Sequence, residues 1–221
     1  DLTGSPALIG GGSPSPATLQ GTDFYFNGTR LTTVATQSNE TTTLNTTADR
    51  VALGGFANNS EGEFLDGSGN SRFDSAFDYN GDIYELIVFS ADLNTTTRTL
   101  VENYLSSKYD ITLTGTDVYA GDTSTNGDYD RGVFGIGRES TSDFHLAAET
   151  DGLGFDNPSG LDNGDYLTAG YAAATNSSIG TDINGVGGLE ERMERTWYVD
   201  RSNDTNDDLT ADATITLTDA G

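Results

Sequence analysis

The sequence predicts an all-β protein that contains one short helix. Residues 83–89 alternate two sets of side chains that are both largely apolar, which is typical of a strand covered on both faces. Thr, Asn, Gly and Asp are abundant elsewhere, and turn-forming pairs such as Asn-Gly separate short runs of strand-forming residues. Residues 94–108 have a helical spacing of apolar residues instead. We therefore expect strands, turn-rich connections and a single helix.

The predicted helix has recognisable signals at both ends. Asn94 suits the N-cap, and Lys108 falls in the last turn, where the helix dipole favours a cation. The apolar residues that we expect to face the core recur at one-, three- and four-residue intervals: Leu100, Val101, Tyr104 and Leu105.

Size, charge and cysteine content restrict the function classes. A chain of 221 residues can hold one large all-β domain or two small ones. It has no cysteine, which excludes disulfides, a thiol nucleophile and a cysteine zinc site. The net charge of -25 argues against nucleic-acid and anionic-membrane binding. It fits bound calcium, a saline habitat or simple solubility.

The ends of the sequence carry no targeting signal. There is no initiator Met, signal peptide or long apolar run, so we interpret the chain as a mature or excised piece without a membrane span of its own. Residues 214–218 alternate like the start of a further strand.

The first part of the chain reads as a linker followed by a hairpin and a strand. Residues 1–20 are rich in Gly, Ser and Pro, which favours an irregular segment. Residues 24–33 predict a hairpin because Asn27 and Gly28 tolerate the positive φ angles of a type I′ turn. Residues 51–56 predict the next strand.

Residues 77–111 resemble the last strand and trailing helix of the laminin-G and concanavalin A-like lectin-type β-sandwich (jelly-roll) domains on bacterial surface proteins. The matching residues are Phe77, Gly81, Ile83, Glu85, Leu86, Ile87, Val88, Phe89, Leu93, Tyr104, Leu105, Lys108 and Tyr109. The resemblance implies that residues 21–112 are the C-terminal part of such a domain. It also implies that the domain lacks several strands that would precede the hairpin.

Residues 113–221 predict a second β-sandwich-like module, incomplete at its C-terminus. Strand-forming residues lie around Val133, Tyr166, Trp197 and Ile215, separated by turn-rich connections. This block resembles an uncharacterised β module that follows lectin-like domains in large Bacteroidetes-like cell-surface proteins. Its three motifs stand here as VFGIGR at 133–138, NGDYL at 163–167 with Gly170, and RTWYV at 195–199. Close backbone packing explains the glycines of the first motif better than phosphate binding does, because the third glycine of a phosphate-binding pattern is lacking.

One acidic loop is a candidate calcium site. Between residues 121 and 130, carboxylate and amide oxygens recur within a short turn, as a hard cation with six to eight oxygen ligands requires. The candidate ligands are Asp122, Asn126, Asp128 and Asp130. The alternative is a surface turn stabilised by its own Asx side chains.

The usual catalytic patterns are lacking in the sequence. The single histidine, His145, lies between Phe144 and Leu146 without a nucleophile-elbow sequence, so we expect a packed or turn histidine. The paired-carboxylate motif E-x-D-x-x-E of concanavalin-like glycanases does not occur. Glu85 is the only acid in its predicted strand. We therefore expect a protein that is not an enzyme.

Surface modification and glycan stacking are further expectations. Sequons nominate five glycosylation candidates: Asn39, Asn45, Asn58, Asn176 and Asn203. Asn27 and Asn94 also head sequons but have structural roles as turn and cap. Tyr79, Tyr129 and Tyr171 lie in predicted loops, where each either stacks on a sugar ring or packs against a strand edge.

Together these features predict an extracellular, non-catalytic segment of a larger surface protein that serves adhesion or assembly, with calcium as a candidate stabiliser. Its partners would be other copies of itself or other surface proteins, or glycans. One alternative is a subunit of an extracellular filament or sheath, completed by strands from neighbouring chains. The other alternative is a glycan-binding lectin module.

Overall fold

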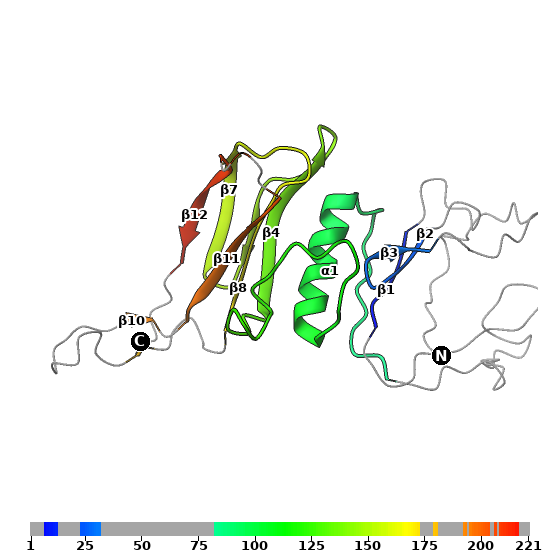
Figure 1. The fold of residues 1–221 in the computed structure, drawn as a ribbon, viewed down its shortest axis with the longest axis horizontal. Coiled ribbons are helices and arrows are strands. Elements are labelled where there is room, and N and C mark those ends of the chain that lie inside the picture. The colour runs from blue at the N-terminus through cyan, green and yellow to red at the C-terminus, as the bar shows by residue number, and fades with distance from the viewer. Residues whose placement is uncertain are drawn as a thin grey trace, which may run out of the picture.

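A computed structural model describes residues 7–12, 23–31, 82–172, 179–180, 192–193, 195–203, 206 and 208–216. These residues form antiparallel sheets and one helix, so the predicted all-β, sandwich-like fold class is confirmed. In Figure 1 two packed sheets lie on one side of the helix and a small sheet lies on the other. The predicted strand 51–56 lies outside the described residues.

The predicted hairpin is present. Strand β2 (Asp23–Phe26) turns through Asn27 and Gly28, which have φ angles of 46° and 82°, into β3 (Thr29–Arg30). Asn27 also connects the hairpin to the rest of the fold, because its carbonyl accepts a hydrogen bond from the Thr114 backbone amide at 3.0 Å. The side chain of Asn27 accepts a second bond from the amide of Leu8 at 2.8 Å.

The expectation of an irregular segment over residues 1–20 is wrong in one part. Strand β1 (Ile9–Gly12) pairs antiparallel with β2, with Ile9 opposite Phe26. Glycine is a weak strand former, so local propensity gave no signal for this strand. The pairing with β2 and the hydrogen bonds between Leu8 and Asn27 stabilise β1 instead.

The predicted helix is present as α1 (Thr95–Tyr109). The side chain of Asn94 caps it by accepting a hydrogen bond from the Thr97 amide at 2.8 Å. At the other end Asp110 has a φ angle of 53°, in the left-handed conformation that commonly terminates helices.

The expected core-facing side of α1 is only partly right. Leu100 is buried, but Val101, Tyr104 and Leu105 are half-buried. The buried residues are mostly small and polar: Thr96, Thr99, Glu102, Asn103, Ser106 and Ser107. Most of them bond to backbone groups, as when Asn103 donates to the Thr116 carbonyl at 2.7 Å and accepts from the Val118 amide at 2.9 Å. Satisfied polar groups of this kind are stable inside a protein.

The second module is a sandwich of two antiparallel sheets. The larger sheet has the order β11 (Trp197–Ser202), β8 (Tyr166–Tyr171), β4 (Arg131–Ser140) and β5 (Asp143–His145). The smaller sheet has the order β12 (Thr210–Ile215), β7 (Leu153–Ser159) and β6 (Ala148–Thr150). The short strands β9 (Ile179–Gly180) and β10 (Arg192–Met193) pair with each other. Strands therefore occur around all four residues that the sequence indicated.

The main hydrophobic core lies between these two sheets. Its buried members are Ile136, Leu153, Phe155, Leu161, Leu167, Ala169 and Leu209. The other face of the larger sheet packs against α1, where Tyr166 joins Leu100 and Val118 in a second cluster. The helix that the lectin-like resemblance assigns to the first domain thus contacts β4 of the second module.

The predicted strand at 83–89 is not observed. Residues 82–89 form no regular secondary structure and pair with no strand among the described residues. The two alternating apolar sets are also exposed rather than covered, with exposed fractions of 73% for Val88 and 67% for Tyr84. The alternation identified an element that needs strand partners, and the described residues do not provide them.

Candidate functional site

The VFGIGR motif on β4 packs closely against β8, its neighbour in the larger sheet. Ile136 points into the sandwich core, whereas Gly135 and Gly137 point to the opposite face. A Cβ atom at Gly137 would lie 2.3 Å from the Tyr166 ring, and one at Gly135 would lie 2.6 Å from the Leu167 carbonyl oxygen. The interpretation of these glycines as close-packing residues is confirmed.

The other two motifs support the same sheet. Arg138 donates to the Leu161 carbonyl at 3.1 Å, and its own carbonyl accepts from the amide of Gly164, which has a φ angle of 98°. The guanidinium of Arg195 lies 3.9 Å from the centre of the Tyr171 ring and is 3.0 Å from the Asp151 carboxylate. Because these motif residues bond to structural neighbours, the motifs describe the frame of the module.

The candidate calcium loop is held together by its own hydrogen bonds. The Asn126 amide nitrogen donates to the Ala120 carbonyl at 2.7 Å. The Asp122 carboxylate accepts from the Ser107 hydroxyl at 3.1 Å, and Asp128 has a φ angle of 54°. Asn126 and Asp122 are therefore already engaged, as expected of the Asx-stabilised turn. Among the described residues no three His, Cys, Asp or Glu side chains are arranged as a metal site, and calcium stays a prediction.

This loop is nevertheless electrostatically strained. Burial raises the pKa of Asp122, with a further contribution from the negative charges of Asp117 and Asp130. Burial together with the charges of Asp128 and Asp110 raises the pKa of Asp130. A nearby cation would relieve this repulsion, and so would a proton.

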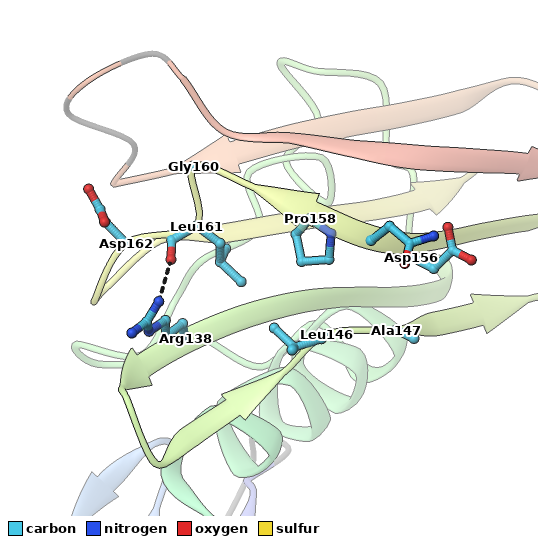
Figure 2. A pocket seen from close by; sticks show the side chains of 9 residues that line it. Arg138, Leu146, Ala147, Asp156, Pro158, Gly160, Leu161 and Asp162 are labelled. Atoms are coloured by element: carbon cyan, nitrogen blue, oxygen red, sulfur yellow. Dashed lines mark hydrogen bonds between the residues drawn. The ribbon is translucent and has the colours of Figure 1, made fainter.

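A cleft of about 770 Å³ opens at the edge of the sandwich. Figure 2 shows Leu146 and Ala147 on one side and Pro158 on the other, with Arg138 at one end bonded to Leu161. Asp156 and Asp162 add carboxylates to the lining. The cleft therefore combines an apolar lining with charges of both signs. No sequence pattern predicted a cleft at these residues.

Two buried polar atoms lie where the hairpin meets α1. Glu102 Oε1 pairs with Arg98 at 2.8 Å, but Glu102 Oε2 and Thr116 Oγ1 have no hydrogen-bond partner among the described residues. Both atoms lie close to Gly28, since a Cβ there would be 2.0 Å from Thr116 Oγ1 and 3.4 Å from Glu102 Oε2. Arg98 in turn stacks on Tyr25 of β2, with 3.9 Å between its guanidinium carbon and the ring centre.

Residues 83–89 carry six of the exposed large apolar side chains among the described residues. In Figure 1 this segment runs beside α1, on the side away from β4. Its exposed apolar side chains are Ile83, Tyr84, Leu86, Ile87, Val88 and Phe89. Within the described chain its backbone groups make no hydrogen bond to another backbone group. We call these residues the apolar segment.

The apolar segment is attached to the last turn of α1. Glu85 forms an ion pair with Lys108 at 3.0 Å and accepts from the Tyr109 hydroxyl at 2.9 Å. The hydrogen bond from Lys108 is the main cause of a lowered pKa at Glu85. Tyr84 packs against Tyr109 with ring centres 5.7 Å apart. Glu85 thus belongs to an anchoring network.

The remaining predicted residues have mixed outcomes. His145 is half-buried on β5, and burial lowers its pKa. Tyr129 packs on Tyr198, and Tyr171, which ends β8 rather than lying in a loop, packs on Trp197. Asn203 is exposed and donates to the Gly164 carbonyl. The candidates Asn39, Asn45, Asn58, Asn176 and Tyr79 lie outside the described residues.

Sequence reasoning missed Asp143. It lies on β5 and accepts hydrogen bonds from the amides at the start of α1. An isolated Asp carries no local signal for a contact 47 residues away in the chain.

Comparisons of the chain with protein-family models, with curated proteins and with solved structures found no significant match. Among the described residues no helix is long and apolar enough to cross a membrane. The function is therefore argued from the chain itself.

Proposed function

We propose that this chain is a non-catalytic, extracellular segment of a surface protein and serves adhesion or assembly. The observation that carries the proposal is the exposure of the apolar segment, residues 83–89. Contiguous exposed apolar surface of several hundred Å² marks interaction sites in soluble proteins. A segment whose backbone groups make no backbone hydrogen bond within the described part of the chain adds the hydrogen-bonding edge that strand addition uses.

The anchoring network favours an adhesive role for the apolar segment, because it holds the exposed residues in a fixed position. Glu85, Lys108 and Tyr109 attach the segment to a capped helix, and that helix packs on the sandwich through β4. Preorganisation of this kind reduces the entropy that binding costs. The resemblance of residues 77–111 to lectin-type surface domains supports the extracellular location. Calcium at Asp122, Asn126, Asp128 and Asp130 remains part of the proposal.

A bead assay tests this function. Polystyrene beads coated with the chain are expected to cluster with one another or to attach to a protein-coated surface. Beads coated with Leu86→Lys should lose this behaviour, because a charge in the apolar segment opposes burial. Val199→Lys on β11 is the matched control, since Val199 and Leu86 are both 51% exposed. Identical behaviour of all three proteins contradicts the proposal.

A further inference from the structure

We propose that the apolar segment pairs with the same segment of a second copy, as two antiparallel strands related by a two-fold axis. This inference rests on the proposed function and names the partner of the same surface. Pairing of identical patches is the commonest geometry of soluble homo-oligomers. It would give the segment the strand partner that its alternating sequence calls for.

The size of the surface fits a dimer contact. Six large apolar side chains of the segment are exposed, with fractions from 38% at Ile87 to 73% at Val88. Alternate residues of a strand point to opposite faces, so the strand pair brings together the exposed side chains of each face separately. The contact is therefore on the order of a few hundred Å² per copy, which is the size of a weak dimer rather than of an obligate one.

Charge also favours a second copy at this place. The chain has a net charge of -25, so most of its surface repels another copy. Within residues 83–89 the only charged side chain is Glu85, and Lys108 is paired with it. The apolar segment is thus a neutral patch in a strongly acidic chain.

A two-fold axis through Leu86, the middle residue of the segment, pairs all of residues 83–89. With Leu86 on the two-fold axis, it lies opposite its own copy, Tyr84 lies opposite Val88, and Ile83 lies opposite Phe89. Glu85 then lies opposite Ile87, so no like charges face each other across the pair. Tyr84, Leu86 and Val88, which are all more than half exposed, share one face of the paired strands.

Disulfide trapping in the full chain tests this register, because the protein has no cysteine of its own. Leu86→Cys places two thiols opposite each other, with Cα atoms about 4.5–5.5 Å apart, within the reach of a disulfide. Val88→Cys is the matched control, since the offset of four residues separates its two thiols by about 13 Å. Under mild oxidation the Leu86→Cys dimer is expected to form at least ten-fold faster than the Val88→Cys dimer. Sedimentation equilibrium of the unsubstituted chain at tens of micromolar should give a dimer mass.

Equal cross-linking rates, or a monomer mass for the unsubstituted chain, overturn the pairing. If the coated beads still cluster in that case and Leu86→Lys abolishes the clustering, the adhesive function stands and only the proposed partner is wrong. If clustering is also absent, both proposals fail.

Discussion

The carboxylate of Asp143 on β5 accepts a hydrogen bond of 2.9 Å from the backbone amide of Thr96, in the first turn of α1. Its second oxygen accepts from the Thr95 amide, also at 2.9 Å. A carboxylate at a helix N-terminus satisfies unpaired amides and interacts favourably with the helix dipole. Asp143 therefore joins the helix to the sandwich.

Asp143→Ala is expected to lower the free energy of unfolding by about 1–2 kcal/mol. Burial alone would raise the pKa of Asp143, but the bonds from Thr96 and Thr95 lower it overall. A lowered folded-state pKa gives stability that is present above the unfolded-state pKa and is lost as pH falls through the folded-state value. Urea unfolding at pH 7 and at acidic pH, with the exposed Asp156→Ala as control, should show a difference that shrinks in acid.

The contrast between α1 and residues 83–89 shows which structural features could be predicted from the sequence. The ends of α1 and the turn at Asn27 were predictable because caps and tight turns depend on a few neighbouring residues. The polar buried face of α1 was not, because its side chains bond to groups elsewhere in the chain, as Asn103 does with Thr116 and Val118. The alternation at 83–89 indicated strand-like chemistry but contained no information about which strand would pair with it.

The candidate sites divide in the same way. The acidic loop was predictable as a cluster because its residues are close in sequence, yet its internal bonds from Asn126 to Ala120 depend on the fold. The cleft around Arg138 brings together residues from β4, β7 and the connection after β5, so no local pattern could indicate it.

Gly137→Ala is expected to destabilise the protein by about 1–3 kcal/mol, because the added methyl group would collide with the buried Tyr166 ring. Gly154→Ala on β7 is the control, since its nearest contact is the Glu149 Cβ at 3.3 Å, on the side chain of a surface residue. Chemical denaturation of both variants compares them. Equal stabilities would contradict the packing role of the VFGIGR motif.

Without calcium at pH 7, Asp130→Asn is expected to raise the melting temperature. The gain in the free energy of unfolding should not exceed about 1 kcal/mol, because solvent screens the charge. A folded-state pKa raised above the unfolded value means that the folded state binds the proton more tightly. The charged form is therefore destabilising at neutral pH, and the wild-type protein gains stability as pH falls through the folded-state pKa. The advantage of the variant should shrink over the same interval. Asp156→Asn, at an exposed residue of β7, is the matched control.

Calcium is expected to raise the melting temperature if the acidic loop binds it. At a concentration about 100-fold above the dissociation constant, the gain in stability is about 2.7 kcal/mol. Combined Asp128→Ala and Asp130→Ala substitutions should remove this gain. Calorimetry in calcium and in EDTA checks it, and identical melting curves for the wild-type protein would exclude calcium as a stabiliser.

Hydrogen exchange of residues 83–89 tests the central claim, that the apolar segment pairs with the same segment of a second copy, most directly. Backbone amides without partners exchange rapidly, whereas amides paired between copies are protected in proportion to the fraction of dimer. We predict exchange that is fast in dilute solution and at least ten-fold slower at high protein concentration, with Leu86→Lys fast throughout. Protection that does not depend on concentration, or fast exchange at every concentration, would contradict the account.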